Sequence, residues 1–224
     1  MKPLSIGLVI AISMGSAAAS AEHLVHSHRG YGSSPNFYVF GGLGASEFDT
    51  DAGDIRYSFG DGSLHDITVD NQSTAARFGF GLMLNEAVSI ELGYASLGEL
   101  GADARSDGSR VLNNGYAAGP VDIEGDVDGG FFGVRLHTPM SEPASAFVRA
   151  GLYGWNMEGR VEDSSRSGRF LLEGSDVYMG VGFMMALSPS AGVSLSYDYY
   201  MLEDDSRAFE SAADVLSVDL LLAF

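Results

Sequence analysis

The sequence of 224 residues contains no cysteine, a single tryptophan and a single lysine. Without cysteine, disulfides and thiol chemistry are both excluded. The lysine is Lys2, and the chain as a whole carries a formal net charge of −18. A charge of this sign argues against nucleic acid as a partner and against simple attraction to anionic lipid surfaces.

Long apolar runs are also missing beyond the first residues of the chain. Leu4 to Met14 is apolar, follows Lys2, and precedes an A-x-A pattern at Ala19-Ser20-Ala21. This order is typical of a cleavable signal peptide, here residues 1–21. The alternative, a membrane anchor, would need a longer run, because a spanning helix takes ~20 apolar residues.

Residues 22–35 are polar and rich in glycine and serine, which predicts a flexible N-terminal arm. The arm holds His23, His26 and His28, which could bind a metal weakly, but no carboxylate or cysteine pattern completes a site. We therefore expect neither a metal nor another cofactor.

The rest of the chain, residues 36–224, alternates between apolar and small or polar residues, and period-two alternation is typical of strands. The pattern predicts eight strands. They are Asn36–Ser46, Ser73–Leu84, Val88–Leu97, Gly125–His137, Ser145–Met157, Ser175–Leu187, Gly192–Leu202 and Ala213–Phe224.

The connections between these strands alternate in length. Short links at 85–87, 138–144 and 188–191 alternate with long ones at 47–72, 98–124, 158–174 and 203–212. Strict alternation places all long loops at one end of an antiparallel sheet. An even strand number with short turns at one end is typical of outer-membrane barrels. The sequence predicts an all-β fold, an eight-stranded antiparallel up-and-down transmembrane β-barrel.

The two sets of alternating residues indicate which face of each predicted strand meets lipid. In Val88–Tyr94, for example, Val88, Ile90, Leu92 and Tyr94 alternate with Ser89, Glu91 and Gly93. A water-facing exterior would be rich in charge, whereas small residues suit the narrow interior of an eight-stranded barrel. We therefore expect the apolar face to meet lipid, with tyrosines such as Tyr94, Tyr197 and Tyr199 in its interfacial girdle.

The opposite face then fills the lumen and carries charges of both signs. The expected lumenal network consists of Arg77, Glu91, Arg135, Arg149 and Asp219. Buried charges need partners of opposite sign, which a closed interior can supply. If Arg149 points inward, so does Trp155. A plug that fixes the barrel and a pore lined by these charges remain alternatives.

Three segments carry a resemblance to a known family: "GFGLMLNEAVSIELGYASLGEL", "MGVGFMMALSPSAGVSLSYDYYMLEDD" and the ending "DVLSVDLLLAF". In order and spacing they resemble the OmpA-like eight-stranded outer-membrane barrels, roughly over residues 36–224. The resemblance implies that Glu91 and Arg135 occupy lumenal charged positions and that Arg149, Gly151 and Trp155 belong to an inward-facing run.

The ending is similar to the C-terminal assembly signal of that family, which consists of Val218, Leu220, Leu222 and Phe224. It implies the barrel-assembly machinery as a partner. Two positions depart from the family pattern, because a second lumenal acid is replaced by Met184 or a neighbour and a basic position by Ser194. We therefore do not expect this chain to have the family's gating network in its full form.

Enzymatic and metal motifs are weak. His65-Asp66 is the only adjacent pair of its kind in the long loops, His137 falls at the short-turn end, and neither G-x-S-x-G nor H-E-x-x-H occurs. Asp49, Asp51 and Asp54 could hold Ca²⁺, but the EF-hand pattern is incomplete and solvated charge is favoured. We expect no catalytic site and no enzyme activity.

The sequence thus predicts a monomeric β-barrel in the outer membrane of a Gram-negative bacterium, in contact with outer-membrane lipids and lipopolysaccharide. Its expected role is structural or surface-interacting, with an occluded or very narrow lumen. A small-solute porin and, less favoured, a surface enzyme acting on lipid or peptide are the alternatives. Divalent ions could bridge the acidic loops to lipopolysaccharide.

Overall fold

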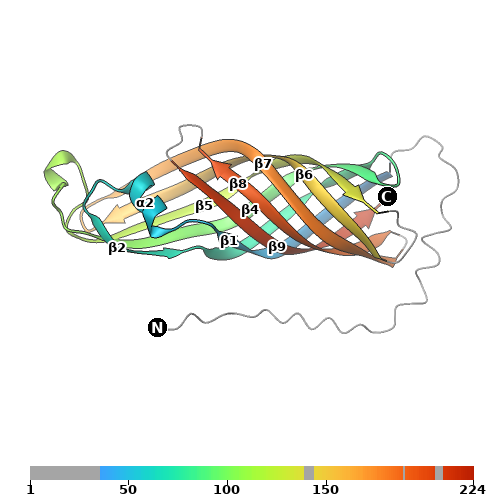
Figure 1. The fold of residues 1–224 in the computed structure, drawn as a ribbon, viewed down its shortest axis with the longest axis horizontal. Coiled ribbons are helices and arrows are strands. Elements are labelled where there is room, and N and C mark those ends of the chain that lie inside the picture. The colour runs from blue at the N-terminus through green and yellow to red at the C-terminus, as the bar shows by residue number, and fades with distance from the viewer. Residues whose placement is uncertain (1–35, 139–143, 189, 205–208) are drawn as a thin grey trace.

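The computed structural model describes residues 36–138, 144–188, 190–204 and 209–224. Within these residues nine strands and one α-helix follow one another along a single elongated body (Figure 1). The predicted signal peptide at residues 1–21 and the arm at 22–35, with its three histidines, lie outside the described residues.

Most of the described chain is strand. The elements are β1 (Asn36–Phe48), α2 (Ala52–Phe59), β2 (Leu64–Asp70), β3 (Gln72–Met83), β4 (Val88–Ser106), the 3₁₀ turn η1 (Val111–Asn113), β5 (Gly119–His137), β6 (Ala144–Asp163), β7 (Ser167–Ser188), β8 (Ala191–Glu203) and β9 (Glu210–Ala223).

Eight of the strands close into a ring. Each pairs antiparallel with its neighbours in the chain, β4 pairs with both β3 and β5, and β1 closes the ring by pairing with β9. At the seam, Phe224 N donates to Phe37 O at 2.9 Å. The predicted fold class, an eight-stranded antiparallel up-and-down barrel, is confirmed.

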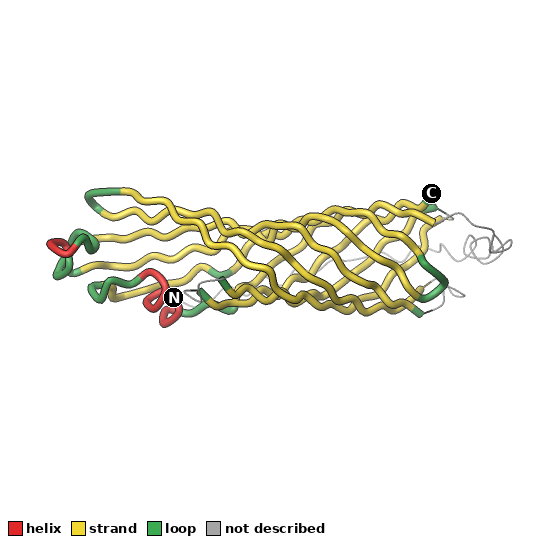
Figure 2. Tube along the Cα trace, turned by 90° about the horizontal axis from the view of Figure 1, so that it is seen from above, coloured by secondary structure: helices red, strands yellow, loops and turns green. Residues whose placement is uncertain are grey.

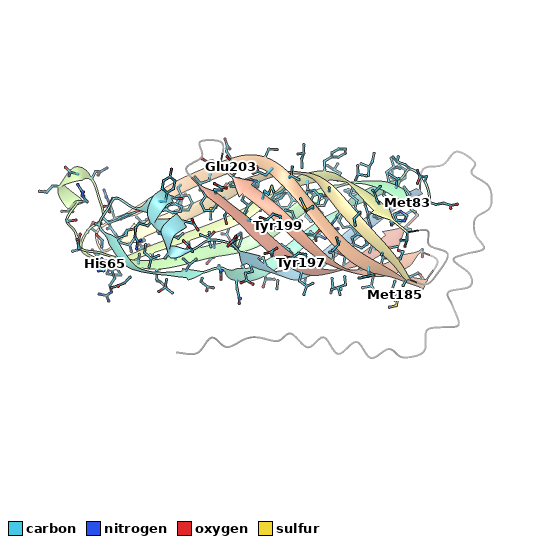
Figure 3. The ribbon with its side chains drawn as sticks, in the orientation of Figure 1. His65, Met83, Met185, Tyr197, Tyr199 and Glu203 are labelled. Carbon is cyan, nitrogen blue, oxygen red and sulfur yellow. The ribbon has the colours of Figure 1, made fainter. Side chains whose placement is uncertain are left out.

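The outward face of the ring is apolar over a continuous band. Phe80, Leu92, Phe132, Leu152 and Phe183 are each more than half exposed on this face, as a lipid-facing surface requires. In Figure 3, Met83 and Met185 lie at the end with the short turns and His65 lies at the opposite end. Among the described residues no helix is long and apolar enough to cross a membrane.

Four strands continue well beyond the closed ring at the end with the long connections (Figure 2). β4, β5, β6 and β7 run for 19, 19, 20 and 22 residues, whereas β1, β3, β8 and β9 run for 12 to 14. β2 pairs with the upper part of β4 and lies outside the ring. We call this part the extracellular sheet, because long connections lie on the extracellular side in outer-membrane barrels; it comprises β2 and residues 99–106, 119–127, 157–163 and 167–175.

The loops predicted at 98–124 and 158–174 were therefore largely wrong, because most of these residues extend β4 to β7. The same period-two pattern continues there, for example in "VDIEGDVD" from Val121, where Val121 and Ile123 are buried and Asp122 and Glu124 are exposed. Beyond the apolar band, the outer face of these strands changes from apolar to acidic. A search for strands with an apolar outer face therefore stops before the strands end.

The predicted loop at 47–72 contains α2 and β2. Asp51 begins α2 because its side chain accepts hydrogen bonds from Gly53 N and Asp54 N. Asp51 N in turn donates to Asp54 Oδ2, which completes a capping box. Ile55 of α2 packs with Leu64, Ala104 and other apolar residues on the inner face of the extracellular sheet. The helix thus gives this sheet a small core of its own.

Candidate functional site in the barrel lumen

Six charged side chains from six different strands meet inside the ring. Three are arginines and three are acids, and all six are at least 93% buried. They are Arg77, Glu91, Arg135, Arg149, Asp198 and Asp219. Strand alternation places them there, because each shares the inward face of its strand with small residues. The structure places all five residues of the sequence-based set in this cluster and adds Asp198.

Two arginine–carboxylate pairs have bidentate geometry. Arg77 donates from Nε and Nη2 to the two carboxylate oxygens of Asp219 at 2.6 and 2.5 Å. Arg149 binds Asp198 in the same way, with Nε to Oδ1 at 2.6 Å and a second short bond from Nη2 to Oδ2. Parallel N–H···O bonds of this kind are among the strongest hydrogen bonds in proteins.

Glu91 lies between the guanidinium groups of Arg135 and Arg149. Its Oε1 accepts from Arg135 Nη1 at 3.2 Å and from Tyr38 OH at 2.8 Å, while Oε2 lies 3.8 Å from Arg149 Nη1. Arg135 and Arg149 are directly opposite each other on β5 and β6. Glu91 therefore separates two like charges that would otherwise repel in a medium of low dielectric constant.

The six charges form one continuous alternating chain. Arg77 Nη1 lies 3.7 Å from Asp198, which joins the Arg77–Asp219 pair to the rest. The order is then Arg135, Glu91, Arg149, Asp198, Arg77 and Asp219. Three positive and three negative charges balance, as burial of ions requires.

Glycines opposite the acids make the space for this chain. Gly42 faces Asp219 and Gly180 faces Asp198 across neighbouring strands. A Cβ atom added to Gly42 would lie 2.3 Å from the Asp219 carboxylate, and one on Gly180 would also overlap the Asp198 carboxylate. A Cβ on Gly151 would lie 2.2 Å from Phe132 O. These positions fit glycine alone.

The two positions that depart from the family pattern contact the network. Ser194 Oγ donates to Asp219 at 3.0 Å, and Met184 Sδ lies 3.7 Å from Arg135 Nη2. The Phe147 ring lies 3.7 Å from Arg135 Cζ, a geometry that favours a cation–π contact. Polar and aromatic neighbours here replace a further ion pair.

A layer of aromatic side chains lies beside the charges. Tyr178 and Tyr200 are stacked with centroids 5.4 Å apart, Tyr153 meets Tyr200 edge-on at 5.0 Å, and Phe131 meets Tyr178 at 5.7 Å. Trp155 is buried next to Phe209 and donates from Nε1 to Asp176 at 2.7 Å. These large rings fill the width of the barrel.

One cavity lined by Arg77, Tyr200 and Ser217, among other residues, measures about 10 Å³, the size at which a single water fits. The arrangement of charges and rings can hold the strands together and can block passage.

The other candidate residues lie away from this cluster. His65 Nε2 lies 3.8 Å from Asp66 Oδ2, and both side chains are at least half exposed. His137 is buried at the short-turn end, with Nε2 3.5 Å from Ser89 Oγ. Asp51 and Asp54 cap α2, and the part of the chain that the structure describes holds no group of three His, Asp or Glu placed to bind a metal.

The C-terminal residues lie on the outer face of β9 and at its end. Val218, Leu220, Leu222 and Phe224 are exposed by 37%, 50%, 42% and 80%. Their side chains belong to the lipid-facing band next to the β1–β9 seam. A role in assembly remains a prediction.

Comparison with known proteins decides the family. The model of the OmpA-like transmembrane domain matches residues 33–224. The chain belongs to the OmpA-like transmembrane domain family. Its members are outer-membrane barrels, so this chain is an outer-membrane β-barrel. Among curated proteins none matches the sequence.

Solved structures share the fold of this OmpA-like barrel at low identity. Ail, the attachment invasion locus protein of Yersinia pestis, is 13% identical with a TM-score of 0.50, over 86% of this chain and 100% of its own. Neisserial surface protein A is 12% identical with a TM-score of 0.51, over 84% of this chain and 97% of its own. Identities this low show a common fold alone.

Proposed function

We propose that this chain is a non-enzymatic outer-membrane barrel whose closed lumen anchors a rigid extracellular sheet for contacts at the cell surface. The observation that carries the proposal is the filled lumen, where a balanced chain of six charges lies beside a layer of aromatic rings. Such a plug stabilises the ring and blocks diffusion through it.

The proposed setting is the outer membrane of a Gram-negative bacterium, reached with a cleaved signal peptide and the barrel-assembly machinery. The apolar band contacts membrane lipids and the extracellular sheet rises among lipopolysaccharide, with the barrel acting as a monomer. Ail has been crystallised with the heparin analogue sucrose octasulfate. With a net charge of −18, this chain is a poor match for such a polyanion.

A small-solute porin is the second candidate. Two contacts favour it, because Arg149 and Arg77 each have a second acid at 3.8 and 3.7 Å besides their main partner. Exchange of both partners would rearrange the charge chain, but it would leave Arg135 and Asp219, at the two ends of the chain, without an ion-pair partner of their own. The aromatic layer would still have to move, which favours the closed barrel.

Ion conductance of the purified barrel in planar lipid bilayers separates the two candidates. The closed barrel is expected to give no resolved steps after insertion has been verified. Reproducible steps would transfer the assignment to the porin.

A further inference from the structure

The outer face of the extracellular sheet contains a depression of about 530 Å³. Two rows of residues cross four strands at this place. The first row is Glu99, Asp126, Glu158 and Leu171, and the second is Gly101, Glu124, Arg160 and Arg169, in register from β4 to β7. All of these residues except Gly101 line the depression, together with Gly125, Gly159 and Phe170. We call this the outer-face depression.

The two arginines of the outer-face depression lie together, apart from most of its acids. Glu99, Asp126 and Glu158 follow one another across β4, β5 and β6, with Glu124 in the second row on β5. Arg160 and Arg169 lie directly opposite each other on β6 and β7. Like charges in directly opposed positions of a sheet destabilise it. Two pairs of acids are directly opposed in this way, Glu99–Asp126 and Asp126–Glu158. One pair of arginines, Arg160–Arg169, is also directly opposed.

Ion pairs within the protein neutralise only some of the charges in the outer-face depression. Arg160 Nη2 lies 3.2 Å from Glu162, with both side chains about half exposed. For Arg169, the described residues provide no ion pair. Burial and the neighbouring carboxylates of Glu124 and Asp126 raise the pKa of Glu99. Both signs are therefore available to a ligand.

The height of the outer-face depression indicates which molecules reach it. Tyr94, at the border of the apolar band nearer the extracellular sheet, pairs with Gly130 of β5. Asp126 lies four residues from Gly130 on the same strand, in the direction of the extracellular sheet. This corresponds to about 13 Å along the strand. Phospholipid headgroups lie near the tyrosine level, so the depression faces the sugar region of the outer-leaflet glycolipid.

We propose that the outer-face depression binds a zwitterionic group that carries a phosphate and a primary amine, of the phosphoethanolamine type, on the sugar region of an outer-leaflet glycolipid. Arg160 and Arg169 are placed to receive the phosphate, for which opposed guanidinium groups are suited. Glu99, Glu124 and Asp126 receive the ammonium group, and Leu171, 59% exposed, covers the carbon atoms. The site is on the outside of the barrel and does not depend on whether the lumen conducts.

The test is an NMR titration of the full folded chain in detergent micelles with O-phosphoethanolamine, inorganic phosphate and ethanolamine as separate probes. We expect saturable shifts at β4–β7 with O-phosphoethanolamine and binding at least about tenfold weaker with either half alone. The double variants R160Q/R169Q and E99Q/E124Q should each weaken O-phosphoethanolamine binding by a similar factor. R105Q and D103N, on the same face outside the depression, are the matched controls and should bind as the wild type does.

The source of the group is tested by competition against the soluble probe. Lipopolysaccharide substituted with phosphoethanolamine should displace it, whereas unsubstituted lipopolysaccharide and phosphatidylethanolamine nanodiscs should not. The proposal is overturned if the wild type shows no saturable shift, if inorganic phosphate binds equally well, or if the controls weaken binding as much as the site variants. Displacement by the phospholipid would overturn the assignment to the glycolipid.

Discussion

At the scale of single residues, the lumenal charges depend on one another. Glu91 accepts from Arg135 and Tyr38 and lies beside Arg149. Removing its charge leaves two guanidinium groups facing each other across β5 and β6. Breaking one partner of a buried pair is costly because the other charge stays buried without compensation.

We therefore predict that Glu91→Ala lowers the free energy of unfolding by about 3–5 kcal/mol. Urea unfolding in detergent measures it. Glu162→Gln, which removes an exposed partner of Arg160, is the control and should change stability by about 1 kcal/mol or less. Equal unfolding midpoints for the two variants would show that the lumenal network contributes little.

Sequence reasoning located these residues without their pairing. The period-two alternation along each strand placed Arg77, Arg135 and Arg149 inside the barrel, together with Glu91 and Asp219. Asp198 was missed, although it shares the inward face of its strand with Ser194 and Ser196. A comparison of the three predicted positive charges with the two negative ones would have indicated that an acid was lacking. Which arginine binds which acid depends on strand register and side-chain rotamers, and a single sequence specifies neither.

At the scale of strands, close approach between neighbours depends on glycine. A Cβ on Gly151 of β6 would lie 2.2 Å from Phe132 O and 2.5 Å from Gly133 Cα, both backbone atoms of β5. The added methyl group can be accommodated only by separating the two strands, and overpacking of this kind costs about 1–3 kcal/mol or more.

Gly151→Ala is accordingly predicted to reduce stability and refolding yield, measured from the fraction of heat-modifiable folded species on gels. Gly154→Ala, three residues along the same strand, is the matched control, since its Cβ would lie 3.9 Å from the nearest such atom. Refolding of Gly151→Ala at the level of this control would contradict the packing described here.

The far end of the extracellular sheet is held by one buried carboxylate between two loops. Asp163 accepts from Ala117 N at 3.1 Å, Ser165 N at 2.7 Å and Arg166 N at 2.9 Å. Burial would raise the pKa of Asp163, but the hydrogen bonds from Ser165 and Ala117 outweigh it and hold this pKa well below its usual range. Because the pKa of Asp163 is depressed, its ionised form stabilises this end of the sheet fully at any pH above the ordinary aspartate pKa.

That stabilisation is lost as pH falls through the depressed pKa. We predict unchanged hydrogen-exchange protection factors for residues 115–118 from neutral pH to about pH 4, with loss of protection only in stronger acid. Asp163→Asn should lose protection already at neutral pH, whereas Asp107→Asn, at an exposed position nearby, should not. Loss of wild-type protection near pH 5 would contradict the assignment.

The eight strands of the ring were predictable in number and order but not in length, and β2 was not predicted. Period two in the lipid band gave eight strands and the alternation of connection lengths gave their antiparallel order. The upper parts of β4 to β7 were missed because their outer face is acidic. The helix α2 was missed because its cap, Asp51 with Asp54, resembles a solvated acidic loop, and its short apolar face contacts a sheet that was not expected.

At the scale of the whole molecule, a closed membrane ring carries an acidic sheet above it. The ring is stabilised from inside by balanced charges and stacked rings, and its outside is apolar. The extracellular sheet has one face packed on α2 and an outer face free for contacts. The proposed contacts at the cell surface and the proposed closure of the lumen would therefore be two aspects of one architecture.

Single-channel recording of the wild-type barrel in planar bilayers tests closure of the lumen most directly. A known porin in the same bilayers provides the positive control, and protease protection verifies insertion of the barrel. The closed lumen predicts a flat record at all applied voltages at which the bilayer is stable. Reproducible, resolved conductance steps from the inserted wild-type protein would contradict it.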